Sequence, residues 1–438
     1  MKEYLIKNGR VIDPANRIDD VADVVISEGK IEKIGKDLNG RSLQIIDAKG
    51  KFVVPGLIDL HTHLREPGRE DEETVLSGTR AAIRGGFTTV VCMPNTEPAL
   101  DNPKTIKQVK TIIKKDALCN VLIAGTITDG RAGKKLSKFE AMKGEGIVAI
   151  SDDGSPVEDG HIMFSALKEA KKESLLVIDH CEDLKLSTRG VINKGFISTK
   201  MGLHGMPKEA EYERVRRDLG LAKKASSRIH IAHVSCKESV ELIRKAKANG
   251  VKVTCETAPH YFALTEECCV TYDTNTKMNP PLRTTGDVNA IKEALSDGTI
   301  DAIATDHAPH TDSEKGVEFD FAPFGVIGLE TALSLAAVEL VERGALSWPD
   351  AILKMSTNPA RILGLDKGGL KTGGQADIVI IDPNKEYVYE EESIESKCKN
   401  SPFIGWRLKA KVTHVFVAGE LVMNDEVIIY AAEMIGRL

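Results

Sequence analysis

The chain has 438 residues, of which 42% are hydrophobic and 28% are charged, so it can bury a large core and is not expected to be disordered. Its net charge of -6 comes from 59 basic and 65 acidic residues without a long block of one sign, which argues against nucleic-acid or membrane binding. The first residues lack the apolar core of a signal peptide, and no apolar run is long enough to span a membrane. Eight cysteines form no CxxC pair, which favours a reducing compartment, so we expect a soluble cytoplasmic protein.

Short strand-like segments separated by turns occur at both ends of the chain. Near the N-terminus they occupy residues 4–6, 11–12, 21–26, 31–34 and 43–46, and they return at 378–381, 412–417 and 421–423. We therefore predict a small β-sandwich domain formed by both termini, from residues 1–52 and 366–438. Two independent caps are the alternative interpretation.

Residues 53–365 alternate strand-like and helix-like segments, which is the pattern of βα units in a parallel sheet. The predicted strands cover residues 52–58, 88–93, 121–127, 146–151, 175–181, 229–234, 251–257 and 301–305. Helices are expected over 70–84, from Asn102-Pro103 onward, after Gly160, over 207–225, up to Asn249, and over 287–295, 328–343 and 349–363. Eight such strands predict an α/β fold of the (β/α)8 TIM-like barrel type, with its active site where the strands end.

Histidines and carboxylates collect at the ends of these predicted strands. In Asp59-Leu60-His61-Thr62-His63-Leu64-Arg65, the two histidines share one face of the strand with Asp59 and Arg65. Later strand ends carry Asn95, Asp152-Asp153, Asp179-His180, His233, Glu256 to His260, and Asp306 to His310. Imidazole and carboxylate groups are the ligands that zinc and similar divalent ions prefer. The sequence therefore predicts a metal site at this end of the barrel, with Asp59 beneath it as support for a ligand histidine.

The remaining histidines have other expected roles. Strand alternation in Ile229-His230-Ile231-Ala232-His233 places His233 toward the site and His230 toward the helices, so we interpret His230 as structural. We expect His260 to support the site rather than to bind the ion, and His307 to point away from Asp306. His161, His204 and His414 lie outside the strand ends and are expected to be surface or core residues.

Two segments at the first and last barrel strands form specific motifs. They are Asp59-Leu60-His61-Thr62-His63-Leu64-Arg65-Glu66-Pro67 and Ala304-Thr305-Asp306-His307-Ala308-Pro309-His310, the latter followed by Lys315. Between and after them, in order, come 93–96 (Met-Pro-Asn-Thr), 151–154, 179–182, 233–235, 257–260, 279–283 (Asn-Pro-Pro-Leu-Arg), 324–325 and 358–360. This series, which covers nearly the whole chain, resembles the dihydroorotase family of the amidohydrolase superfamily, in its long bacterial type.

The resemblance implies a set of metal ligands and substrate contacts. The implied ligands are His61, His63 and Asp306 on a first ion, His180 and His233 on a second, and Asp153 between them. The implied substrate contacts are His63, Arg65, Asn95, Asn279, His310, Phe324 and Gly325. The implied cofactor is Zn²⁺, one or two per subunit, with a binuclear site preferred. Hydantoin hydrolases of the superfamily bridge the ions with a carboxylated lysine from the fourth strand, where this chain has Asp153, so occupancy of the second position stays open.

The implied reaction is the reversible interconversion of N-carbamoyl-L-aspartate and dihydroorotate in pyrimidine (UMP) biosynthesis. A divalent ion would lower the pKa of water and polarise the amide, Asp306 would be the catalytic proton carrier, and Arg65 would anchor the substrate carboxylate. Two alternatives stay open: a hydantoinase- or allantoinase-like amidohydrolase, and a non-catalytic partner subunit of aspartate transcarbamoylase. We further expect a homo-oligomer, with a complex with aspartate transcarbamoylase left open.

The loop from His307 to Glu318 follows the last predicted strand and contains Pro309 and Gly316. Its length and charge favour a flexible lid over the site, and an ordinary exposed loop is the alternative.

Overall fold

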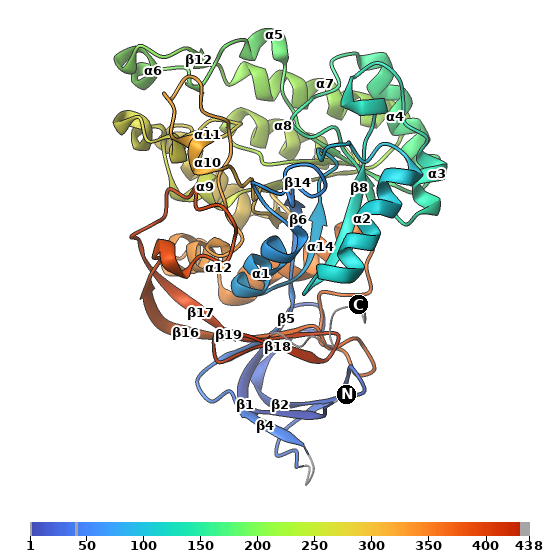
Figure 1. Cartoon of the computed structure of the whole chain (residues 1–438), viewed down its shortest axis with the longest axis vertical. Coiled ribbons are helices and arrows are strands. Elements are labelled where there is room, and N and C mark those ends of the chain that lie inside the picture. The colour runs from blue at the N-terminus through green and yellow to red at the C-terminus, as the bar shows by residue number, and fades with distance from the viewer. Residues whose placement is uncertain (1, 40–42, 430–438) are drawn as a thin grey trace.

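The computed structural model describes residues 2–39 and 43–429, which form a barrel of parallel strands above a terminal β-sheet (Figure 1). The barrel strands are hydrogen-bonded in the order β15-β14-β13-β10-β9-β8-β7-β6. They span Leu57–Thr62 (β6), Phe87–Cys92 (β7), Asn120–Gly125 (β8), Ala149–Ile150 (β9), Leu176–Asp179 (β10), Ile229–Ile231 (β13), Val253–Thr257 (β14) and Ala302–Ile303 (β15). The predicted eight-stranded α/β barrel is confirmed, with strand limits shifted by a few residues.

The barrel closes between β6 and the residues that follow β15. The Asp59 carboxylate accepts the backbone N–H of Thr305 at 3.1 and 3.2 Å. Thr62 forms a parallel bridge with His307, and the backbone N–H of His63 donates to the His307 carbonyl at 2.9 Å. The two motif-bearing segments, which are far apart in the sequence, therefore lie side by side.

Helices cover the outside of the barrel (Figure 1). They are α1 Val75–Gly85, α2 Pro103–Asp116, α3 Phe139–Gly144, α4 Gly160–Lys172, α5 Leu184–Ser187, α6 Phe196–Met201, α7 Glu209–Ala225, α8 Lys237–Ala248, α9 Pro259–Ala263, α10 Thr285–Ser296, α11 Asp312–Lys315, α12 Ala332–Ala336, α13 Trp348–Ile352 and α14 Asn358–Leu363. α2 begins as the sequence predicts, because Asn102 caps the backbone N–H groups of Lys104 and Thr105 and Pro103 occupies the first turn. α1 starts five residues later than predicted (residue 75, not 70), where Thr74 caps it.

Both predicted helices after residue 328 contain a wider π turn. The turn at Ala337–Val341 follows α12, and the turn at Leu353–Thr357 separates α13 from α14. Such turns insert an extra residue into the helical ladder, which a hydrophobic pattern alone does not reveal.

The two ends of the chain form one nine-stranded sheet in the order β19-β18-β17-β16-β5-β1-β2-β3, with β4 beside β1. Its strands are β1 Tyr4–Asp13, β2 Ile18–Ser27, β3 Lys30–Gly35, β4 Gln44–Asp47, β5 Phe52–Pro55, β16 Ile378–Val388, β17 Arg407–Val417, β18 Glu420–Asn424 and β19 Val427–Ile428. The sheet curls around its own core, since the rings of Tyr4 in β1 and Phe416 in β17 lie 5.0 Å apart. A single β unit built from both termini is confirmed, and the two-cap alternative is wrong.

The domain limits 1–52, 53–365 and 366–438 stay a prediction, and residues 430–438 lie outside the described part. A small separate sheet pairs β11 Ile192–Asn193 with β12 Gly205–Met206. No helix in residues 2–39 and 43–429 has the length and apolar character needed to cross a membrane.

The apolar run 52–58, predicted as one strand, is two strands in different sheets. β5 pairs with β16 in the terminal sheet, whereas β6 starts at Leu57 and pairs with β7 in the barrel. Gly56 joins them at a close contact: a Cβ atom there would lie 2.0 Å from the Thr88 hydroxyl oxygen. The terminal sheet is thus directly continuous with the strand that carries His61.

Candidate active site

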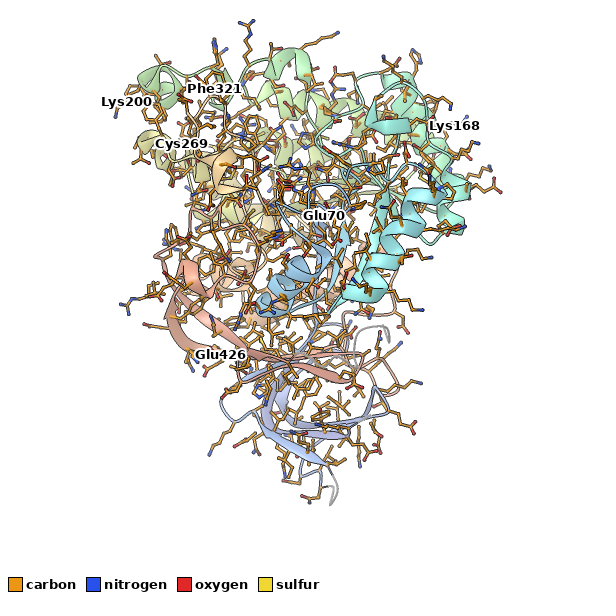
Figure 2. All side chains as sticks on the ribbon, viewed as in Figure 1. Glu70, Lys168, Lys200, Cys269, Phe321 and Glu426 are labelled. Carbon is orange, nitrogen blue, oxygen red and sulfur yellow. The ribbon has the colours of Figure 1, made fainter. Side chains whose placement is uncertain are left out.

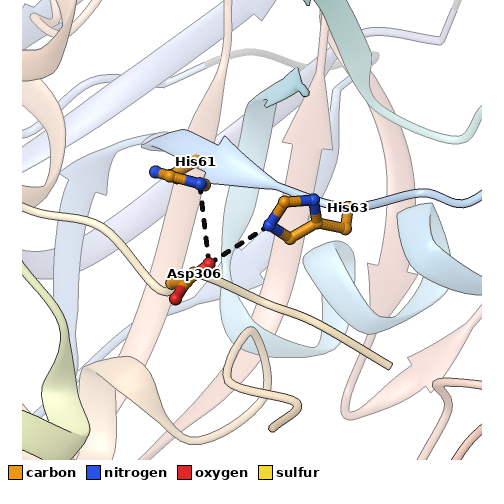
Figure 3. Close-up of side chains that lie close together, drawn as sticks. All are labelled: His61, His63 and Asp306. Carbon is orange, nitrogen blue, oxygen red and sulfur yellow. Dashed lines mark hydrogen bonds and ion pairs between the residues drawn. The ribbon is translucent and has the colours of Figure 1, made fainter. Parts of the chain in front are cut away.

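His61, His63 and Asp306 meet at the C-terminal end of the barrel strands (Figure 3). The Nε2 atoms of His61 and His63 lie 3.5 and 3.2 Å from the same Asp306 oxygen, Oδ1. On the other side, these atoms lie 3.2 and 3.5 Å from the two carboxylate oxygens of Asp153. The four side chains predicted around a first ion therefore surround one point.

His180 and His233 form a second group beside the first. Their facing nitrogens, His180 Nδ1 and His233 Nε2, are 2.9 Å apart. These nitrogens lie 3.6 and 3.7 Å from Asp153 Oδ1. Asp153 thus lies between the two histidine pairs, where a bridging ligand has to be.

The donor set fits a divalent metal ion. His61 Nε2 is buried and has no hydrogen-bond partner within the described residues. Burial would raise the pKa of Asp153 and of Asp306, but the neighbouring histidines outweigh it and lower both, so both groups are carboxylates at neutral pH. Buried carboxylates facing imidazole nitrogens are the coordination chemistry of zinc and related ions. The ligand atoms of His61, His63 and Asp306 lie within 4.8 Å of one another, and so do those of His61, Asp153 and His233.

The far nitrogen of three ligand histidines is held by an acceptor from another strand end or from the same loop. The pairs are His61 Nδ1 with Glu256 at 3.2 Å, His63 Nδ1 with Asn95 at 2.9 Å, and His180 Nε2 with Glu182 at 2.9 Å. Each contact fixes the ring and leaves its other nitrogen free to face the ion. Burial would raise the pKa of Glu256, but hydrogen bonds with His230 and His61 lower it to about 2.

Glu256 and Glu182 were not assigned roles from the sequence, although both lie in motifs that carry the family resemblance or at a predicted strand end. Asp59 was expected to support a ligand histidine, and it does so through the backbone: its Oδ1 accepts the His61 N–H at 3.0 Å. The His61 ring itself is held by Glu256.

The predicted orientation of His230 is wrong. Its Nε2 lies 3.1 Å from Glu256 Oε2 inside the barrel, so His230 supports the acid that holds His61. Ile229 and Ile231 pack among helix residues instead. The parity argument failed because the backbone leaves the strand conformation at His233, where φ is 33°.

Arg65 and His310 share the Glu72 carboxylate at the rim of the site. Arg65 Nε lies 3.0 Å from Glu72 Oε2 and also donates to the Pro309 carbonyl at 3.2 Å. His310 Nδ1 lies 2.8 Å from Glu72 Oε1, and its Nε2 contacts the Phe324 carbonyl oxygen at 2.8 Å. Glu72, which the sequence did not single out, therefore contacts two of the predicted substrate-binding residues, Arg65 and His310.

One cavity of about 340 Å³ collects every predicted substrate contact, a size suited to a small ligand. It is lined by His63, Arg65, Asn95, Asp153, Gly154, His180, His233, Asn279, Asp306, Ala308, His310, Pro323, Phe324 and Gly325. At Gly325, where φ is 124°, a Cβ atom would lie 2.7 Å from the Ala308 Cβ, so a side chain would strain the cavity wall. Of the predicted site residues, His61 alone does not line it, because the ring is buried behind the others.

The first residue of the loop, His307, packs inside the protein at the end of the barrel. His307 is buried, its Nε2 lies 3.3 Å from Glu73, and its Nδ1 accepts the Gly328 N–H, so the ring points away from Asp306 as predicted. His260 is also buried, and burial lowers its pKa to about 4. It does not line the cavity. Movement of the loop as a lid stays a prediction.

Comparison with known proteins gives consistent matches. A family model described as Dihydro-orotase-like matches residues 50–239, and one for the Amidohydrolase family matches 205–423. Dihydroorotase of Elusimicrobium minutum is 53% identical, over 97% of this chain and 98% of that protein. Dihydroorotase of Pelotomaculum thermopropionicum is 52% identical, over 97% of this chain and 100% of that protein.

Solved structures resemble the chain over the same length at lower identity. L-hydantoinase (dihydropyrimidinase) from Arthrobacter aurescens is 25% identical with a TM-score of 0.89, covering 98% of both chains. Dihydropyrimidinase from Brevibacillus agri is 25% identical with a TM-score of 0.86, covering 98% of this chain and 96% of its own. Together with the site geometry, the identity of about 50% over nearly full length shows that this chain belongs to the dihydroorotase family of amidohydrolases.

Proposed function

We propose that the protein is a dihydroorotase, which interconverts (S)-dihydroorotate and N-carbamoyl-L-aspartate in pyrimidine biosynthesis. The observation that carries the proposal is the cavity that five of the six ligand residues line together with Arg65 and His310, two residues that share the Glu72 carboxylate. The cluster suits hydrolysis of an amide, and the guanidinium beside it suits a substrate that carries a carboxylate.

We propose Zn²⁺ as the ion, with two positions that share Asp153. His61, His63 and Asp306 would hold the first ion, and His180 and His233 the second. When bound, the metal would supply an acidic water and polarise the ring amide. The ligand types support zinc, and metal analysis of the purified protein tests both its identity and its stoichiometry.

The chain's own residues would bind the substrate and move its proton. Arg65, whose Nε is already engaged by Glu72, would present its terminal nitrogens to the exocyclic carboxylate. In hydrolysis, Asp306 would take a proton from the attacking water and give it to the ring nitrogen as the amide C–N bond breaks. The water oxygen would end in the new carboxylate of N-carbamoyl-L-aspartate, and the second water proton would pass to solvent as that carboxyl group ionises. Ring closure would take up a proton and follow the same path in reverse.

A hydantoinase-like activity is the second candidate, favoured by the solved structures of similar fold. Two features argue against it. The strand β9 and the residues after it supply Asp153, not a lysine, between the histidine pairs. Hydantoin also has no carboxylate to engage Arg65. A non-catalytic role as a partner of aspartate transcarbamoylase is disfavoured because all six ligand side chains are present.

The test is an assay of the metal-loaded protein with dihydroorotate, hydantoin and allantoin side by side. We expect turnover of dihydroorotate, and turnover of hydantoin alone would overturn the proposal. The same assay with and without added aspartate transcarbamoylase, and the mass of the particle in solution, test the proposed complex and the proposed homo-oligomer. We also propose a cytoplasmic location, which the eight free cysteines support.

A further inference from the structure

Two buried lysines beside the cavity, Lys277 and Lys315, donate their side-chain hydrogen bonds to backbone carbonyls. Lys277 is 2% exposed and Lys315 is 7% exposed. Within the described residues, neither ammonium has a carboxylate within the 4.0 Å of a salt bridge. A buried charge is costly unless hydrogen bonds compensate it, so the carbonyl groups around each lysine have to be held in place.

The two lysines join residues 274–279 to residues 315–325. Each lysine lies in one of these segments and donates to carbonyls of the other. Lys277 Nζ donates to the carbonyls of Phe319 and Asp320 at 2.7 and 3.0 Å. Lys315 Nζ, from the loop, donates back to the Thr274 carbonyl at 3.0 Å and to the Pro323 carbonyl at 2.9 Å. The loop therefore cannot leave segment 274–279 without breaking both sets of bonds.

The tied segments end in the cavity wall. Asn279 follows Lys277 by two residues and lines the cavity. Phe324 lies under the Lys277 ammonium, 4.7 Å from its ring centre, and the Gly325 N–H donates to the Lys277 carbonyl at 3.0 Å. Three of the proposed substrate contacts thus lie in or next to the segments that the two lysines join.

We propose that Lys277 and Lys315 are positioning residues, which hold Asn279, Phe324 and Gly325 in the geometry that binds substrate. The proposal rests on the proposed dihydroorotase activity for its kinetic consequence, although the link between the two segments can be measured without turnover. Neither lysine contacts the ligand cluster, so their loss should affect substrate binding more than the chemical step.

Lys354 offers a matched control. It is also buried, at 4% exposed, and its Nζ donates to a carbonyl, that of Ile300, at 2.7 Å. Ile300 precedes β15, whereas Asp306 follows it, so Lys354 lies at the opposite end of the barrel. Methionine at this position removes a buried ammonium without disturbing the cavity.

The experiment compares Lys277→Met, Lys315→Met and Lys354→Met as metal-loaded proteins. For the first two we expect KM for dihydroorotate to rise about tenfold with kcat changed less than about threefold. For Lys354→Met we expect an unchanged KM and a lower melting temperature. If Lys277→Met and Lys315→Met only lower the melting temperature, as Lys354→Met does, the positioning role is wrong.

Chymotrypsin cleavage gives a readout that needs no turnover. Just after the loop, Phe319 is buried, whereas Phe321 is 79% exposed at the surface (Figure 2). We expect faster cleavage after Phe319 in Lys277→Met and Lys315→Met than in the wild type or Lys354→Met. Equal rates in all four proteins would overturn the proposal. If the cleavage rates differ as expected but the wild-type protein does not turn over dihydroorotate, the proposed function is wrong and the positioning role is not. Should Lys315→Met not fold, Lys277→Met carries both readouts.

Discussion

Asp306 is the residue to which we assign two proposed roles, metal ligand and proton carrier. Its Oδ1 faces both His61 and His63, and the histidines lower its pKa although burial would raise it, so it starts as a carboxylate. An amide in its place keeps an oxygen for the ion but cannot exchange a proton with the ring nitrogen.

We therefore predict that Asp306→Asn lowers kcat about 100- to 10,000-fold. Metal content, measured by elemental analysis, and binding of a substrate analogue, measured by calorimetry, should be largely kept. Wild-type turnover in this variant would remove Asp306 from the proton path.

The proposed role of Arg65 is to bind the substrate carboxylate. Its guanidinium is held by Glu72 and the Pro309 carbonyl at the rim of the cavity. Replacement by alanine should raise KM about 10- to 100-fold, because a charge-assisted hydrogen bond contributes roughly 1.5–3 kcal/mol. Arg65→Lys keeps the positive charge but lacks the planar guanidinium, so its KM should lie between the values for the wild type and for Arg65→Ala. Steady-state kinetics with dihydroorotate decide the matter, and an unchanged KM in Arg65→Ala would exclude carboxylate binding by this side chain.

Replacement of Glu256 tests whether the acceptors that hold the ligand histidines affect metal affinity. It lies between His61 and His230, and losing its charge should loosen the His61 ring. Glu256→Gln should weaken metal affinity about 10- to 100-fold in a chelator competition. Glu330→Gln, which replaces another buried acid away from the cavity, should leave metal affinity at the wild-type level. Equal affinities in both variants would mean that the contact does not tune the ion.

Among the elements, the buried Glu330, which lies just before α12, holds the segment around residues 395–396 that precedes β17. Glu330 Oε1 accepts the backbone N–H groups of Glu395 and Ser396 at 2.9 and 3.1 Å. Burial raises the pKa of Glu330 from 4.5 to about 7. Between those two values the folded protein keeps a proton that the unfolded chain releases, so the free energy of unfolding falls as the pH rises.

Glu330→Gln should remove this loss, because the amide oxygen still accepts both N–H groups and does not titrate. We expect the melting temperatures of variant and wild type to agree near about pH 5 and the variant to be more stable near about pH 8, by about 2–3 kcal/mol. Thermal unfolding across this range measures the effect. Glu390→Gln, at an exposed side chain nearby, should show no such trend. A constant offset between wild type and Glu330→Gln would contradict the titration.

The elements predicted best from the sequence are those with a local cause. α2 was placed by Asn102 and Pro103, and each barrel strand by its apolar run. Non-local features were missed. The run 52–58 is apolar throughout because both of its halves are buried, and nothing in it shows that Gly56 passes from one sheet to another. Likewise, alternation counted back from His233 fails where the backbone turns.

The sequence predicts which residues form the candidate site, but not the hydrogen bonds that connect them. Strand ends and the family resemblance brought together the ligand histidines, Asp153 and Asp306, and the structure gathers them around one point. Which nitrogen of each ring faces the ion depends on partners from other strands, such as Glu256 behind His61. Those pairings, and the Glu72 contact with both Arg65 and His310, arise only when the barrel is closed.

In the whole molecule, the contact between β6 and the residues after β15 has a consequence for how the protein is synthesised. His63 and Asp306 are 243 positions apart in the chain, yet they belong to the same three-ligand group. A ribosome has made most of the protein before the last ligand of that group emerges. Until then His61 and His63 lack the Asp306 carboxylate, so a nascent chain cannot yet assemble the complete site. Hydrolytic chemistry therefore begins only once the first and last strands have met.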